Sequence, residues 1–333
     1  MAPEQATVIG ETGGSGTDGT GPTADGTARA TIPPPVPGHP YDLRQFFHAV
    51  GHFSGERALT STPVTRKELD TPAEVIDPGP AQITDEPLAS ASFIDGVQAA
   101  LMVTHRAHRP VYLNYAGAGA LDRDLRPVGL NERLWVTCSS LDEDWARGLG
   151  SNIPIVVLSQ ETSPPDLEGA ALTALANTRA ALERHLVRDL MARPAGALVL
   201  DGALIGQEDN TRLYGVVKST NHKYLADESC LFGLRAGWRS PRFIIPAGVA
   251  GCAHERYSCY LRLHDATHDR WNFALVRLEC FGNPDLLGPL AALCMAERQG
   301  PGSGDGRWDR HLRAVRRTED FLRARRPKAF SLL

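Results

Sequence analysis

The amino-acid sequence predicts an α/β fold in which a mixed sheet is flanked by helices. Three observations support this prediction. Short runs rich in Val, Ile, Leu and Tyr begin at Ala91 and recur as far as Cys280, a long amphipathic segment interrupts them, and two helical segments close the chain. This order of strands, helix, strands and helices favours one mixed sheet over alternating βαβ units. With 333 residues, 42% of them hydrophobic, the chain can bury a sizeable core.

The first 90 residues differ in composition from the rest. Residues 1–40 are rich in Gly, Thr, Ala and Pro and carry almost no large apolar side chain. Such a segment cannot bury enough surface to offset the entropy of ordering, so we expect a flexible tail. Residues 41–90 form an N-terminal extension, with a short helix expected over 42–50 and a Pro-rich polar stretch after it.

Strands are expected first between residues 91 and 165. The apolar runs 91–94 and 99–104 flank Asp95-Gly96, which predicts a hairpin turn between two strands. The run 154–158 is rich in Ile and Val, which suits a central strand. Two further strands are expected at 110–116 and 133–138.

A long helix is expected from about Asp166 to Arg193. Pro164 and Pro165 precede it, Pro194 with Gly196 ends it, and leucines at intervals of three and four give it an apolar face. The later strands are expected at 197–200, 213–218, 242–246, 258–264 and 271–280, and the closing helices at 286–298 and 307–325.

The net charge and the cysteine content exclude several classes of protein. The net charge of -4 argues against coating nucleic acid through bulk charge, although it leaves room for a local basic groove. None of the six cysteines forms a CxxC pair, so we expect no structural zinc site and a reducing, cytoplasmic compartment. We also expect no transmembrane segment and no secretory signal, because no apolar run is long enough and no basic segment precedes one.

Two predicted strand ends carry the same Asp-Gly pair, which places a carboxylate where it can take part in a reaction. Asp95 and Asp201 each follow an apolar run and precede a glycine, which lets the chain turn away and leaves the carboxylate at the sheet edge. Glu183 borders the apolar face of the long helix, where its charge needs a counter-ion. Two ordinary turns and a salt bridge of Glu183 with Arg179 or Arg184 explain the same residues. If the three carboxylates meet, they favour Mn²⁺ or Mg²⁺, which prefer oxygen ligands.

An ordered series of segments resembles the NurA family of nucleases, the partners of HerA-type hexameric ATPases. The resemblance covers about Ala91 to the C-terminus and implies a ribonuclease-H-like nuclease domain over 91–330, with an insertion at about 105–165. It implies a metal-dependent DNA nuclease that acts with a HerA-like translocase in DNA end processing or anti-phage defence. The segments that carry it are Phe93-Ile94-Asp95-Gly96, Arg179-Ala180-Ala181-Leu182-Glu183, Leu198-Val199-Leu200-Asp201-Gly202-Ala203-Leu204 and Gly215-Val216-Val217-Lys218-Ser219.

The resemblance also assigns roles to individual residues. Asp95, Glu183 and Asp201 would be metal ligands for Mn²⁺, or Mg²⁺, in a reaction that two ions can catalyse by activating a water and stabilising the leaving oxygen. Lys218 would be a catalytic group close to the phosphate, although a surface lysine after a strand explains it equally. A homodimer is implied. The sequence has no P-loop, so ATP hydrolysis would come from the partner ATPase.

The chain departs from the family pattern near its C-terminus. Where the family carries Gly-Tyr-Pro and then a His on the next helix, this sequence reads Gly282-Asn283-Pro284-Asp285, and the expected His position falls near Ala291. Asp285 is one substitute, and the cluster of His and Asp over 264–269 is another, although it also suits a polar hairpin loop. The departure keeps an alternative open: a catalytically degenerate ribonuclease-H-like module that serves assembly or DNA binding.

The last helical segment is strongly basic. Residues 307–328 carry nine basic and three acidic side chains. We expect Arg310, Arg313 and Arg317, together with Lys218, to contact DNA phosphates. A solvated Arg-rich terminal helix is the equal alternative.

Overall fold

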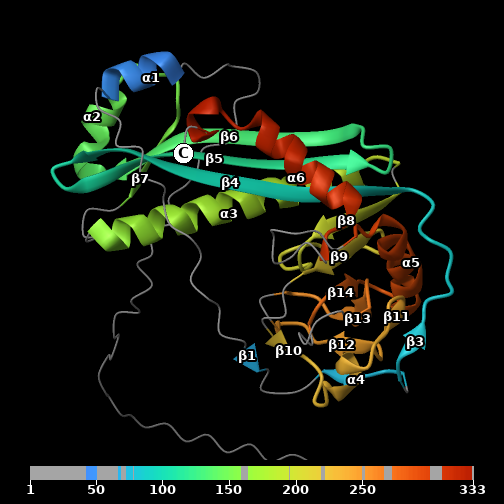
Figure 1. The fold of residues 1–333 in the computed structure, drawn as a ribbon. Helices are drawn as coiled ribbons and strands as arrows, with labels where there is room; N and C mark the ends of the chain where they lie inside the picture. Colours follow the sequence, from blue (N-terminus) through green and yellow to red (C-terminus); the bar gives the residue numbers. More distant parts are fainter. Residues whose placement is uncertain are drawn as a thin grey trace, which may run out of the picture.

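The computed structural model describes residues 43–50, 67–68, 73–77, 79–158, 164–194, 196–218, 222–249, 252–265, 272–300 and 310–331. The expected tail at 1–40 lies outside these residues. The α/β prediction is confirmed, because a large mixed sheet runs through the molecule with helices packed against it (Figure 1). Among the described residues, no helix combines the length and the apolar character that crossing a membrane requires.

Four helices were predicted from the sequence, at 42–50, 166–193, 286–298 and 307–325, and α1, α3, α5 and α6 lie within or close to these ranges, whereas α2 and α4 were not predicted. The long predicted helix is confirmed as α3, which contains Pro164 and Pro165 in its first turn, where proline is tolerated. The described α-helices are α1 (Leu43–Val50), α2 (Glu143–Arg147), α3 (Pro164–Met191), α4 (Ser229–Phe232), α5 (Leu287–Glu297) and α6 (Arg313–Arg325).

The strands vary widely in length, and the longest lie together in one half of the sheet. They are β1 (Lys67–Glu68), β2 (Glu74–Val75), β3 (Ala81–Gln82), β4 (Ala91–Arg106), β5 (Arg109–Asp122), β6 (Pro127–Ser139), β7 (Ile155–Leu158), β8 (Ala197–Asp201), β9 (Leu213–Val217), β10 (His222–Lys223), β11 (Trp238–Arg239), β12 (Phe243–Ile245), β13 (Arg256–Arg262) and β14 (Leu275–Cys280).

The main sheet has twelve strands within the described residues, in the order β2-β12-β13-β14-β9-β8-β4-β5-β6-β7, with β11 and β3 attached beside β13. Strands β4, β5 and β6 pair antiparallel, and β8 and β9 continue the sheet parallel to β4. The strands from β9 through β14 and β13 to β12 pair antiparallel. The parallel pair β4 and β8 therefore lies near the middle of the sheet.

The expected hairpin turn at Asp95-Gly96 is wrong. Strand β4 runs without a break through both residues, and Gly96 pairs with Ala118 of β5. The turn comes instead at Ala107 and His108, which both adopt positive φ. Gly96 is used for close packing rather than for turning, because the side chain of Glu183 occupies the space that a Cβ there would need.

The segment expected to be an insertion, about 105–165, is continuous with the sheet. It supplies β5 and β6, which pair along almost their whole length, and then β7. The expectation that residues 154–158 form a central strand is wrong, because β7 ends the sheet order and pairs only with β6 among the described strands. Its residues are mostly half-buried, which its Ile and Val content did not reveal.

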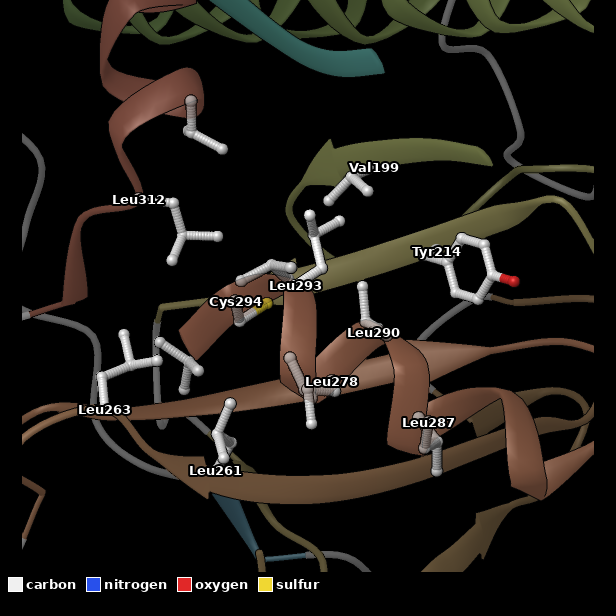
Figure 2. Close-up of a cluster of buried hydrophobic side chains, with 14 of the residues drawn as sticks. Val199, Tyr214, Leu261, Leu263, Leu278, Leu287, Leu290, Leu293, Cys294 and Leu312 are labelled. Atoms are coloured by element: carbon white, nitrogen blue, oxygen red, sulfur yellow. The ribbon is translucent and has the colours of Figure 1, made fainter. Parts of the chain in front are cut away.

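Two apolar layers cover the two faces of the central strands. On one face, α5 and the start of α6 pack on β8, β9, β13 and β14 (Figure 2). On the other face, Leu182 and Leu186 of α3 pack against Ile94 of β4. Successive side chains of a strand point to opposite faces, so Phe93 belongs to the first layer and Ile94 to the second. We call these the α5–α6 face and the α3 face.

Candidate carboxylate site

Asp95 and Asp201 lie side by side on the parallel strands β4 and β8. The register pairs Ile94 with Leu200, so the next residues in the two strands are these aspartates. Phe93 and Val199, two residues earlier, pack in the layer on the α5–α6 face. The period of two therefore directs both aspartates to that same face. Asp95 is 7% exposed and accepts a hydrogen bond of 2.7 Å from the backbone N–H of Gly96.

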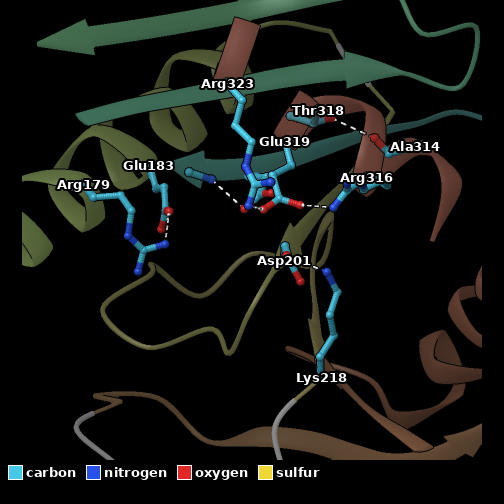
Figure 3. A network of polar contacts seen from close by, with 11 residues as sticks. Arg179, Glu183, Asp201, Lys218, Ala314, Arg316, Thr318, Glu319 and Arg323 are labelled. Carbon is cyan, nitrogen blue, oxygen red and sulfur yellow. Dashed lines mark hydrogen bonds and ion pairs between the residues drawn. The ribbon is translucent and has the colours of Figure 1, made fainter. Parts of the chain in front are cut away.

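Lys218 brings a positive charge to this pair. It follows β9, and its Nζ donates to Oδ2 of Asp201 at 2.9 Å (Figure 3). Both side chains are less than 20% exposed, so the ion pair is partly shielded from solvent. The structure thus brings together three of the four residues that the sequence nominates: Asp95, Asp201 and Lys218.

Glu319 of α6 joins this group, and the sequence analysis did not nominate it. Its carboxylate accepts from Arg323 Nη2 at 2.6 Å and pairs with Arg316 Nη1 at 3.3 Å (Figure 3). The signal was present in the sequence, because Glu319 stands four residues after Val315 and three before Leu322, both of them buried. This spacing puts Glu319 at the edge of the helix face that packs on the sheet.

The electrostatics agree with this grouping. The pKa of Asp95 lies well above its ordinary value, first because the carboxyl is buried and then because Asp201 is negatively charged. The Lys218 ammonium and the Gly96 N–H oppose this rise, and the charge of Glu319 adds to it. An ionised Asp95 is therefore a charge that the folded protein compensates only in part.

Glu183 lies on the α3 face, across β4 from Asp95. Its Oε1 is packed over Gly96, and Arg179 Nη1 donates to the same oxygen at 2.9 Å. Burial raises the pKa of Glu183 while Arg179 lowers it, and the charge of Asp201 raises it again. The charge of Asp201 raises the pKa of both Asp95 and Glu183. The carboxylates of Asp95 and Glu183 nevertheless belong to opposite faces of the sheet, because Asp95 shares the face of Phe93 and Glu183 packs over Gly96.

The arginines nominated for DNA contact have structural partners. Arg310 donates to the carbonyl oxygens of Lys218 and Asn272 at 2.6 and 2.8 Å. Arg313 pairs with the buried carboxylate of Glu297 at 3.1 Å. The side chains of Arg313 and Arg317 are 52% and 60% exposed, and Arg317 lies 4.0 Å from Asp320, so its ion pair is the longer of the two.

The proposed substitutes for the C-terminal His are placed elsewhere. Asp285 is 77% exposed and pairs with Arg242 at 2.6 Å. Ala291 belongs to α5 and is fully buried in the apolar layer on the α5–α6 face. In the cluster 264–269, His264 contacts the carbonyl of Gln299 and Asp265 accepts from a backbone N–H, while residues 266–269 lie outside the described part.

A cavity of about 510 Å³ lies between the C-terminal half of α3 and the loop that follows β8. Arg184, Arg188 and the loop 206–210 line it. Two arginines and two acidic residues, Glu208 and Asp209, give it no clear charge preference, and neither Asp95 nor Asp201 borders it. We therefore place the chemistry at the carboxylates rather than in this cavity.

The carboxylate oxygens at this site suit a divalent cation such as Mn²⁺ or Mg²⁺, but in the described residues they do not converge on one point. In the part of the chain that the structure describes, no three Asp, Glu, His or Cys side chains come close enough together to hold a metal ion. The available donors are carboxylate oxygens, the ligands that Mn²⁺ and Mg²⁺ prefer. The partly compensated charge of Asp95 is what such a cation would neutralise. Without a cation, Lys218 pairs with Asp201 and Arg179 pairs with Glu183.

No protein-family model and no curated protein matches this chain.

Proposed function

We propose that the protein is a metal-dependent DNA nuclease of the NurA type. The observation that carries the proposal is the pairing of Asp95 and Asp201 on adjacent parallel strands, with Lys218 bonded to Asp201. The sheet order supports it. Strands β6-β5-β4-β8-β9 run as three antiparallel strands followed by two parallel ones, which is the arrangement of a ribonuclease-H-like sheet.

Each residue has a role in this proposal. Asp95 and Asp201 would hold Mn²⁺ or Mg²⁺, and the bound ion would activate water and stabilise the leaving oxygen of the phosphodiester. The family resemblance implies Glu183 as a third ligand, but its carboxylate packs over Gly96 on the opposite face of the sheet. Lys218 keeps the Asp201 carboxylate in place through its 2.9 Å contact and would contact the phosphate of a bound substrate. Burial under α6 limits the access of bulk water to Asp95.

The nuclease assay with Mn²⁺ tests this proposal. Asp95→Asn and Asp201→Asn keep the side-chain volume but remove the charge, so each should lower cleavage at least about 100-fold, the upper end of what the loss of a supporting metal contact costs. Asp320→Asn on α6 is the matched control, since its carboxylate is 41% exposed and pairs with Arg316. Wild-type cleavage rates in both site variants would show that the site is wrongly assigned.

A second candidate function is a non-catalytic module that binds DNA or supports assembly. It is favoured by the absence, within the described residues, of three metal-binding side chains close together. The two functions differ in a simple measurement. The degenerate module binds DNA without any Mn²⁺-dependent cleavage, and Asp95→Asn leaves that binding unchanged.

The proposed function includes a partner ATPase. A HerA-like hexameric ATPase, with this chain as a homodimer in the cytoplasm, would supply the translocation of DNA in end processing or anti-phage defence. The sequence motif series and the lack of a P-loop in the sequence support it.

A further inference from the structure

We propose that the cavity between α3 and the loop after β8 binds a ribonucleoside monophosphate. Its volume of about 510 Å³ lies within the range of about 300–1,000 Å³ that is usual for small-molecule sites. Neither Asp95 nor Asp201 is among the described residues that line it, so the inference does not depend on the proposed nuclease. Three observations on the described residues support it.

Two arginines of α3 bring positive charge to one wall of the cavity. Arg184 and Arg188 stand one helical turn apart and both line it. Neither side chain makes an ion pair or a hydrogen bond with any described residue, whereas Arg179 earlier in the same helix pairs with Glu183. Like charges four residues apart destabilise a helix. A phosphate group relieves this repulsion, and guanidinium groups bind phosphate through two parallel hydrogen bonds.

Gln207 adds a polar group to the same cavity. It is only 7% exposed and lines the cavity beside the two arginines. Its side-chain amide makes no hydrogen bond with any described residue. Buried amides are almost always hydrogen-bonded, because an unpaired one costs free energy. The missing partner therefore belongs in the cavity, where a ligand meets the amide.

The loop that carries Gln207 is held at both ends. Near its start, the Leu204 N–H donates to Glu279 Oε2 at 2.9 Å, and the Gln207 N–H donates to the Leu204 carbonyl at 3.4 Å. Near its end, Asn210 Oδ1 accepts from the Arg212 N–H at 2.9 Å. A loop fixed in this way loses little conformational entropy when a ligand binds.

The other lining residues define the rest of the ligand. Glu208 and Asp209 come from the loop, and neither forms an ion pair with a described residue. Carboxylates at nucleotide sites accept hydrogen bonds from ribose hydroxyls. Val187 and Leu213 are 4% and 1% exposed and give an apolar wall for a base. The charges of the cavity nearly cancel, but they remain unpaired with each other, and a nucleotide matches both kinds.

Isothermal titration calorimetry of the full chain with the four ribonucleoside monophosphates tests the inference. At least one nucleotide should bind at least about tenfold more tightly than its nucleoside or inorganic phosphate, which each make only part of the contacts. Arg184→Gln and Arg188→Gln should each weaken that binding about 10- to 100-fold, the usual loss of a hydrogen bond to a charged group. Arg193→Gln is the control, since Arg193 donates to the Val128 carbonyl and does not line the cavity. It should bind the nucleotide as the wild type does.

Gln207→Leu separates binding from a structural role. It should weaken nucleotide binding at least about fivefold and melt no lower than the wild type, because it removes an unpaired buried amide. A melting temperature below that of the wild type would show that the amide supports the fold instead, and would contradict the inference.

Three further results would overturn the inference. The first is that none of the four nucleotides binds at about 1 mM, the level of a very weak complex. The second is that inorganic phosphate binds as tightly as the best nucleotide. The third is that Arg184→Gln and Arg188→Gln both keep wild-type affinity, which would place the nucleotide elsewhere. DNA cleavage by the wild type, in contrast, bears only on the proposed nuclease.

Discussion

Asp95 is a carboxylate that the folded chain buries with incomplete compensation. One backbone N–H and one ammonium group stabilise its charge, whereas burial and two neighbouring carboxylates oppose it. A residue chosen for stability alone would be apolar or amide at this position, as its buried neighbours Phe93 and Ile94 are apolar. The free-energy cost of burying the Asp95 charge is expected at a position that binds a cation.

This cost predicts a pH dependence of stability. The pKa of Asp95 is raised from 3.8 in the folded state, so the folded protein binds this proton more tightly than the unfolded chain does. Stability therefore falls as pH rises from about 4 through the raised pKa. Asp95→Asn removes this effect and should melt above the wild type at pH 7 in metal-free buffer, by a difference that shrinks as pH approaches 4.

Thermal melts from pH 4 to pH 8 measure the difference, with Asp320→Asn as the control for an exposed carboxylate on α6. A difference between Asp95→Asn and the wild type that stays constant over the whole range would contradict the account. So would an Asn variant that melts below the wild type at pH 7.

At the scale of elements, the loop after β8 fixes the end of the strand that carries Asp201. The Gly202 N–H donates to the carbonyl of Val216 at 2.9 Å, and the Leu204 N–H donates to Glu279 Oε2 at 2.9 Å. Glu279 is fully buried and pairs with Arg256 and Arg277. The path of the loop is therefore set by the sheet, and Asp201 is positioned through it.

Gly215 of β9 is the point where this packing is closest. A Cβ there would lie 2.7 Å from the carbonyl oxygen of Gly202, which is backbone and cannot rotate away. Gly215→Ala should lower the free energy of unfolding by about 1–3 kcal/mol, as overpacking of a filled core does. Urea denaturation measures it.

The control is the same replacement at Gly169 in α3, where a Cβ would meet nothing within 4 Å. Alanine is the better helix former, so Gly169→Ala should raise stability by about 0.5–1 kcal/mol. If Gly215→Ala proves as stable as the wild type, the loop does not pack against β9 as described.

Helices and strands were predicted correctly where the hydrophobic pattern extends over many residues. Predictions based on two or three residues, such as the turn at Asp95-Gly96, were wrong. Helix α3 was evident from its leucine spacing and its flanking prolines. The Asp95-Gly96 pair looked like a turn, because local sequence does not show that Glu183, 87 residues later, fills the space over Gly96. Glu319 was missed because an acidic residue among many arginines looks like part of a solvated helix. Only the contact of Thr318 with β4 shows which way it faces.

At the scale of the whole molecule, the net charge of -4 and the internal pairing of most described α6 arginines leave a modest basic surface. We expect weak binding to free DNA that falls steeply with added salt. A ring-shaped ATPase that threads DNA would raise the local concentration of substrate at the site.

The partner prediction follows from this. Addition of a HerA-like ATPase with ATP should raise the cleavage rate at least about tenfold, because a tethered substrate has a high effective concentration. Mass photometry of the mixture should show a dimer of this chain bound to the hexamer. A monomer that forms no complex, and whose cleavage rate does not change with the ATPase, would favour a stand-alone enzyme.

The most direct test of the central claim is to locate Mn²⁺ by anomalous diffraction from crystals soaked in manganese. The account predicts a peak within coordination distance of about 2.0–2.4 Å from carboxylate oxygens of both Asp95 and Asp201, and the loss of that peak in Asp95→Asn. An absence of anomalous density between β4 and β8 at millimolar Mn²⁺, in crystals of a protein that cleaves DNA in solution, would contradict it.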